Sequence, residues 1–164
     1  MVSAYTAFAN KGIRVAPLFV TRIEDSDGNV LSTFAPQMEE VISVSSAYKM
    51  LVMLRSVINE GTGGRVRRYG ITADMGGKTG TTNNETDKWF CGFTPYYTTA
   101  VWVGYDSPKT VADLYGSTYP GRIWHEYMNE IHKDLDVKEF DLGELSSGSS
   151  GGGSSSDYTT PQED

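Results

Sequence analysis

The chain has 164 residues, an apolar share ordinary for a globular protein, and a formal net charge of −7. This length fits one domain, and the scattered Lys and Arg argue against a nucleic-acid partner, because phosphate binding needs a concentrated basic face. A single cysteine excludes an internal disulfide and a thiolate metal cage, and no apolar run reaches the ~18 residues of a membrane-spanning helix. We therefore expect no cofactor and no metal.

The chain should begin with a short helix followed by a β-hairpin. Apolar residues recur at helical spacing within 2–10, and Gly12 follows where a left-handed helix cap is expected. The β-branched segment 13–23, the turn residues 25–29 and the segment 30–34 then predict the hairpin.

A longer amphipathic helix is predicted over 43–60, with a serine near 43–46 as its N-cap and Gly61 at its end. Its apolar face consists of Ala47, Met50, Leu51, Leu54, Val57 and Ile58. The glycine-rich segment 61–77 predicts a mobile loop, and its basic cluster 64–68 is interpreted as a solvated part of that loop.

Three strands should follow, over 77–82, 88–94 and 98–105, with a tight connection at 94–97. This order predicts an antiparallel meander. Residues 100–103 are apolar on both faces, which predicts an interior strand covered by helices on each side.

A last helix is predicted to run from 120 to about 135 and to lie on the sheet. Beyond it, 146–156 contains only Ser and Gly, and 157–164 is acidic. Residues 143–164 are therefore expected to form a disordered tail, which leaves 1–142 as the folded part.

Several chemistry-bearing side chains have structural explanations. Cys91 lies in an apolar run, so a small buried hydrophobe is expected rather than a reactive thiol. His125 and His132 are seven residues apart without the acidic pattern of a zinc helix, and we expect surface or hydrogen-bonded histidines.

The stretch that carries chemistry is Gly77-Lys78-Thr79-Gly80-Thr81-Thr82. On a strand, these residues place an ammonium and hydroxyls along one edge, while Gly80 lets a ligand approach closely. Such an edge suits an extended peptide that ends in a carboxylate, since it offers charge-assisted hydrogen bonds and a strand to pair with. A phosphate loop is excluded because Thr72 stands where its first glycine belongs. On these six residues alone, a glycine-rich connection without chemistry explains the stretch equally well.

The surrounding sequence resembles that of class A penicillin-binding proteins over about residues 1–135. The matching blocks, in family order, are 1–12 with Ala9-Asn10-Lys11-Gly12, 23–31 with Asp27-Gly28, 53–63 with Glu60-Gly61-Thr62-Gly63, 78–83, 89–95 and 101–106. The Lys-Thr-Gly triplet is one of the three motifs of the wider family.

This resemblance implies the C-terminal portion of a transpeptidase domain with an α/β (α+β) fold, an antiparallel sheet flanked by helices, as in penicilloyl-serine transferases. It implies peptidoglycan stem peptides and β-lactam antibiotics as ligands. Lys78 would tune the electrostatics of the site, and Thr79 and Thr81 would hold the ligand carboxylate. The backbone N–H of Thr81 would be an oxyanion-hole donor, and Gly80 and Thr82 would complete the substrate strand.

The nucleophile of the family is expected to lie outside this chain. Ser46 and Lys49 imitate the Ser-x-x-Lys motif but stand between the expected second and third motifs, so Ser46 is interpreted as a helix-capping residue. No Ser-x-Asn occurs, and Asn129 imitates a Tyr-x-Asn variant from the wrong place in the chain. An upstream half of the domain, on the same or a separate chain, is therefore an expected partner.

The resemblance also implies a place on the extracytoplasmic side of the cytoplasmic membrane of a bacterium, anchored through another part of the protein. Two other functions remain open. A non-catalytic module could bind a peptide or a β-lactam at the same edge, and a carboxypeptidase or β-lactamase relative carries the same triplet.

Overall fold

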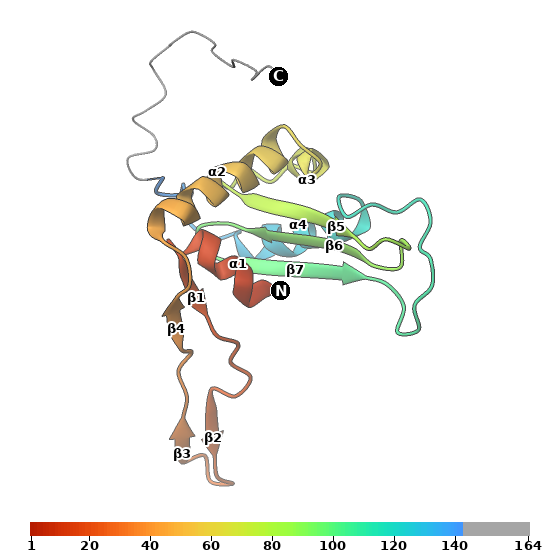
Figure 1. Cartoon of the computed structure of the whole chain (residues 1–164). Helices are drawn as coiled ribbons and strands as arrows, with labels where there is room; N and C mark the ends of the chain where they lie inside the picture. The colour runs from red at the N-terminus through yellow and green to blue at the C-terminus, as the bar shows by residue number, and fades with distance from the viewer. Residues whose placement is uncertain (143–164) are drawn as a thin grey trace, which may run out of the picture.

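The computed structural model describes residues 1–142, so the tail predicted for 143–164 lies outside the described part (Figure 1). The elements in chain order are α1 (Val2–Ala9), β1 (Ile13–Val15), β2 (Arg22–Glu24), β3 (Val30–Thr33), β4 (Met38–Glu40), α2 (Val44–Asn59), α3 (Gly64–Arg68), β5 (Gly76–Thr81), β6 (Lys88–Phe93), β7 (Thr98–Val103) and α4 (Tyr119–Ile131). The predicted mixed fold, with antiparallel sheets and flanking helices, is confirmed.

The main sheet is the predicted meander, in the order β5-β6-β7 with antiparallel pairing throughout. β6 is the central, mostly buried strand. The prediction for 100–103 is half right. Helices α1 and α4 do contact β7, but among the described residues β7 has one strand neighbour and is an edge strand, with Trp102 exposed. Hydrophobic composition alone did not separate an edge strand from an interior one.

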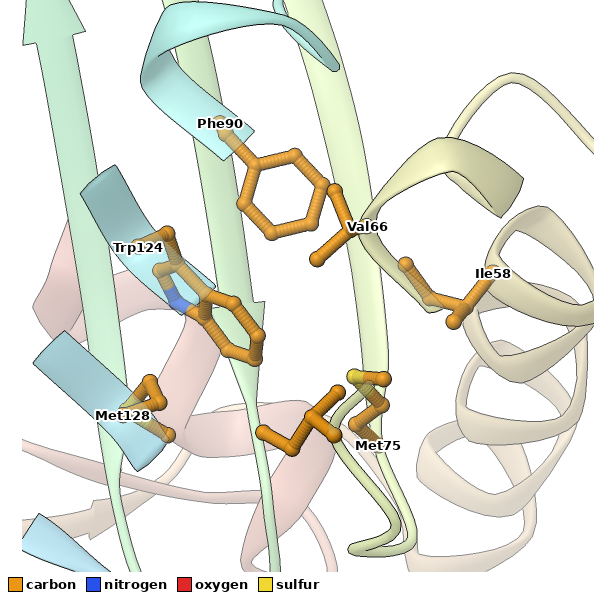
Figure 2. Packing of buried hydrophobic residues seen from close by; sticks show 7 residues of the cluster. Ile58, Val66, Met75, Phe90, Trp124 and Met128 are labelled. Atoms are coloured by element: carbon orange, nitrogen blue, oxygen red, sulfur yellow. The ribbon is translucent and has the colours of Figure 1, made fainter. Parts of the chain in front are cut away.

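Two hydrophobic clusters hold the helices to the two faces of the sheet. The first joins α2, α3, β6 and α4, and consists of Ile58, Val66, Ile71, Met75, Phe90, Trp124 and Met128 (Figure 2). The second lies towards α1 and is centred on Leu51, Leu54 and Phe93. Phe90 and Phe93 belong to different clusters because side chains three positions apart on β6 point to opposite faces. α2 contributes to both clusters and packs against β5.

Helix α2 confirms the prediction for 43–60, and its cap is Ser43, whose hydroxyl accepts from the Ser46 N–H at 3.2 Å. The loop predicted after it is wrong in part, because residues 64–68 form α3. Val66 is fully buried, and Arg67 donates to the carbonyl oxygens of Ile71 and Ala73, so the basic cluster is not simply solvated. Burial of Val66 in the first hydrophobic cluster thus accompanies a short helix in a segment whose glycines had predicted a loop.

Residues 13–41 form an arm that extends away from the main sheet (Figure 1). The predicted hairpin exists as β2 and β3, and Asp25 accepts from the backbone of Asp27 and Asn29 in the predicted turn. The single strand predicted for 13–23 is wrong, since it divides into β1 and β2. β1 pairs with β4, a strand that the sequence analysis did not identify.

Candidate functional site

The Lys-Thr-Gly edge, residues 78–81, lies on β5, the strand at one border of the main sheet. Lys78 and Thr81 are exposed, and Thr79 and Gly80 are half-buried. The strand pleat directs Lys78 and Thr79 to opposite faces. The ammonium nevertheless reaches around the border, where Nζ of Lys78 donates to the Thr79 carbonyl oxygen at 3.0 Å and to Oγ1 of Thr79 at 3.4 Å. The cation and this hydroxyl therefore meet at one accessible edge.

A shallow pocket of about 290 Å³ opens beside this edge. It is lined by Met1, by residues of α1, β5 and β6 and by the turn after β5. These residues are Met1, Tyr5, Lys78, Thr79, Gly80, Thr81, Thr82, Trp89 and Cys91. Burial raises the pKa of the Tyr5 phenol and of the Cys91 thiol, so both are neutral near pH 7. The pocket thus combines a partly aromatic wall with the Lys78 ammonium and several hydroxyls.

The end of the edge is held by Asp87, which the sequence analysis did not single out. The Thr82 N–H donates to the Asp87 carbonyl oxygen at 3.2 Å, and the Asp87 N–H donates to Oγ1 of Thr82 at 3.0 Å. The carboxylate accepts from Nε1 of Trp102 at 2.8 Å and from Thr86. These side-chain hydrogen bonds, the Thr86 hydroxyl first, lower the pKa of Asp87. The only feature of the sequence that could have indicated this role of Asp87 is the position of an Asp at the end of a Thr-rich turn.

The opposite face of β5 is supported by the segment before α4. Gly116 is buried, and a Cβ atom there would collide with the Trp89 carbonyl oxygen and lie 3.0 Å from Cβ of Thr79. The backbone of this segment therefore packs directly against Thr79, a contact that only the tertiary structure shows.

Ser46 and Asn129, which the sequence analysis interprets as imitations of family motifs, lie elsewhere. Ser46 is in the first turn of α2, with its hydroxyl 3.0 Å from that of Ser43. Asn129 is on α4 and lines a different cavity of about 360 Å³, together with His132 and Thr94. Neither Ser46 nor Asn129 lines the pocket beside Lys78.

The two histidines differ. His132 has both ring nitrogens paired, one with Thr94 Oγ1 at 2.8 Å and one with the Met128 carbonyl oxygen at 2.7 Å, as expected. His125 is buried with Nδ1 unpaired, so the expectation is wrong there. Within residues 1–142, no group of three or more His, Cys, Asp and Glu could hold a metal ion, and no helix there is both long and apolar enough for a bilayer.

Comparison with known proteins places this geometry in a family. The model of the penicillin binding protein transpeptidase domain matches residues 1–129, and the chain belongs to that family. Penicillin-binding protein 1A of Aquifex aeolicus is 38% identical over 143 residues, which cover 87% of this chain and 19% of that protein. Penicillin-binding protein 1A of Clostridium acetobutylicum is 38% identical over 141 residues, 86% of this chain and 17% of that protein. The chain thus spans less than a fifth of either relative.

Solved structures agree on the fold. Penicillin-binding protein 1A from Haemophilus influenzae superposes with a TM-score of 0.75 at 24% identity, over 86% of this chain and 27% of that chain. PonA1 from Mycobacterium tuberculosis, a penicillin-binding protein, superposes with a TM-score of 0.70 at 29% identity, over 85% and 40%. The fold is therefore part of the penicilloyl-serine transferase fold.

Proposed function

We propose that this chain supplies the substrate strand of a serine-type peptidoglycan D,D-transpeptidase, with the nucleophile provided by another part of the protein. The observation that carries the proposal is the accessible edge at 78–81, which borders an open pocket. Among the described contacts, the Lys78 ammonium at this edge forms hydrogen bonds only within its own strand. A cationic edge lined with hydroxyls suits a peptide carboxylate or a β-lactam carboxylate.

Each edge residue has a role in this proposal. Lys78 provides the positive potential, and the hydroxyls of Thr79 and Thr81 hold the carboxylate of the ligand. The Thr81 N–H is one oxyanion donor, and losing one such donor raises a barrier by about 3 to 4 kcal/mol. Gly80 leaves room for the ligand backbone, and Thr82 fixes the end of the strand through Asp87. In the reaction, the serine attacks the D-Ala-D-Ala carbonyl carbon, and the terminal D-alanine leaves.

The partner of this chain would be the upstream half of the domain, on the same or a separate polypeptide, and residues 1–142 would form the C-terminal portion of that domain. Two surfaces support this proposal. The outer border of β7 has no strand partner among residues 1–142. Tyr119, Ile123 and Tyr127 form an exposed stripe on α4. We place the whole protein at the bacterial cell envelope, on the extracytoplasmic side of the cytoplasmic membrane and anchored through a part outside this chain.

A fluorescent penicillin tests the proposal. The chain is incubated with the probe alone and with the upstream half supplied in trans, and covalent adducts are located by denaturing gel and mass spectrometry. We expect a label on a serine of the upstream half, and only when both pieces are present. A label on Ser46 of the isolated chain would overturn the assignment of the nucleophile.

The second candidate is a non-catalytic module that binds a peptide or a β-lactam. It is favoured by one observation: among the described residues, no serine lines the pocket beside Lys78. Reversible binding of a penicillin by calorimetry, without a covalent adduct under either condition, would select this function.

A further inference from the structure

A third hydroxyl lies against the Lys-Thr-Gly edge. Oγ1 of Thr62 is 3.1 Å from Oγ1 of Thr79, and either oxygen could be the donor. Thr62 is exposed and belongs to the turn between α2 and α3, well before β5 in the sequence. The motif spacing around Lys78 does not include it, and only the packing of α2 against β5 brings the two threonines together.

The position of Thr62 is built by its neighbours on both sides. The Gly63 N–H donates to the Val57 carbonyl oxygen at 3.0 Å, which ties the turn to the end of α2. A Cβ atom at Gly63 would lie 2.7 Å from Cδ1 of Ile58 and 3.2 Å from the Val57 carbonyl oxygen, so the turn packs tightly against the end of α2. On the other side, α3 is anchored by Val66, which is fully buried in the first hydrophobic cluster. The backbone on either side of Thr62 is therefore held in place before any ligand binds, and the contact with Thr79 orients the hydroxyl.

The hydrogen-bonding capacity of Thr79 makes this contact consequential. A threonine hydroxyl has one proton to donate and two lone pairs that accept. Lys78 already donates to Oγ1 of Thr79. When Thr62 donates to the second lone pair, the Thr79 proton is left to point outward. When Thr79 donates to Thr62 instead, that proton is no longer available to a ligand.

We propose that Thr62 is a positioning residue for the carboxylate of the ligand. By donating to Oγ1 of Thr79, it turns the Thr79 proton towards a carboxylate bound at the edge. Thr62 thus donates to Thr79, and Thr79 donates to the carboxylate. No proton is transferred, because only the direction of the hydrogen bonds changes. The inference rests on the proposed function and adds a specificity to it: Thr62 favours ligands with a free carboxylate over neutral analogues of the same shape.

The test uses the full-length protein that carries this chain, with Thr62→Val, Thr62→Ser and the matched control Thr21→Val, an exposed threonine of the arm. Acylation rates are measured with a penicillin and with its carboxylate methyl ester. We expect Thr62→Val to lower the rate for the free acid by roughly threefold to tenfold, the effect of one lost hydrogen bond. The rate for the ester should stay unchanged, and Thr62→Ser and Thr21→Val should behave like the wild type.

If Thr62 had a purely structural role, Thr62→Val would lower the acylation rates for the free acid and for the ester together. A lower rate for the ester would therefore overturn the inference. Thr62→Val in a Thr79→Val background should have no additional effect, and a further loss there would also contradict it. If the wild type is acylated and Thr62→Val keeps the full preference for the free acid, this inference alone is overturned. If the wild type is never acylated, the proposed function fails, and the inference fails with it.

Discussion

The three-stranded sheet and the arm of residues 13–41 are both antiparallel β-structure, yet they differ in burial. The central strand β6 lies between helices, and both of its faces carry buried side chains. Strands β2 and β4 are exposed at every position, and the arm carries Phe19, which is 94% exposed, and Leu31, which is 66% exposed. The pairs β1–β4 and β2–β3 each have only two strands, and a two-stranded ladder by itself buries little side-chain surface. The sheet is therefore stabilised by its core, whereas the arm depends on local turns and on the contact between β1 and α1.

The largest effect should follow from opening the core of the sheet. Trp124 is fully buried, and its ring packs edge-on against Phe90 with centroids 5.1 Å apart. Trp124→Ala should lower the free energy of unfolding by about 3–5 kcal/mol, because it leaves a cavity between α4 and β6. Denaturant titration followed by tryptophan fluorescence or circular dichroism measures the change, and a loss below about 1 kcal/mol would contradict the assignment of this core.

A smaller loss is expected from Asp74, whose carboxylate connects α2 to the segment after α4. Nε of Arg55 donates to Oδ1 of Asp74 at 2.9 Å, and the other carboxylate oxygen of Asp74 accepts from the Phe140 N–H at 3.0 Å. Asp74→Ala should cost roughly 1–3 kcal/mol, because it leaves a half-buried guanidinium without its partner. The same titration should rank this variant between Trp124→Ala and any variant of the arm.

Acid titration should reveal the contribution of Asp87 to stability. Hydrogen bonds lower the pKa of Asp87 in the folded protein below its unfolded value of about 3.9. Its contribution to stability is therefore complete above that unfolded pKa and is lost as the pH falls through the lower folded pKa. Between about pH 5 and pH 3 the Asp87→Asn variant should lose less melting temperature than the wild type. Parallel acid curves would show that Asp87 does not contribute in this way.

The smallest effect should come from the arm. Leu31 lies on β3 and is largely exposed, so Leu31→Ala should change the free energy of unfolding by less than about 0.5 kcal/mol. Hydrogen exchange should show faster exchange for the arm than for β6, in the wild type and in the variant alike. A loss comparable to that of Asp74→Ala would mean that the arm is covered in solution, and the contrast between the two regions would fail.

Elements that depend on local interactions could be predicted from the sequence, whereas elements that depend on long-range contacts could not. Helix α2, the β2–β3 turn and the order β5-β6-β7 depend on apolar periodicity and on turn residues such as Asp25, which are local. The failures involve long-range contacts. β1 pairs with β4, from which it is separated in sequence by the whole β2–β3 hairpin. α3 includes Val66, whose side chain is buried in the first hydrophobic cluster.

The same division applies to the site. The sequence by itself determined which residues form the edge at 78–81, because a strand bearing Lys, Thr and Gly in succession is a local pattern. The roles of these residues stay a prediction. Only the tertiary structure decided that the Lys78 ammonium bends round to Thr79, that Asp87 holds the end of the strand, and that Thr62 lies within hydrogen-bonding distance. Those contacts depend on how α2 and the turn after β5 pack in three dimensions. The spacing of residues along the chain does not determine that packing.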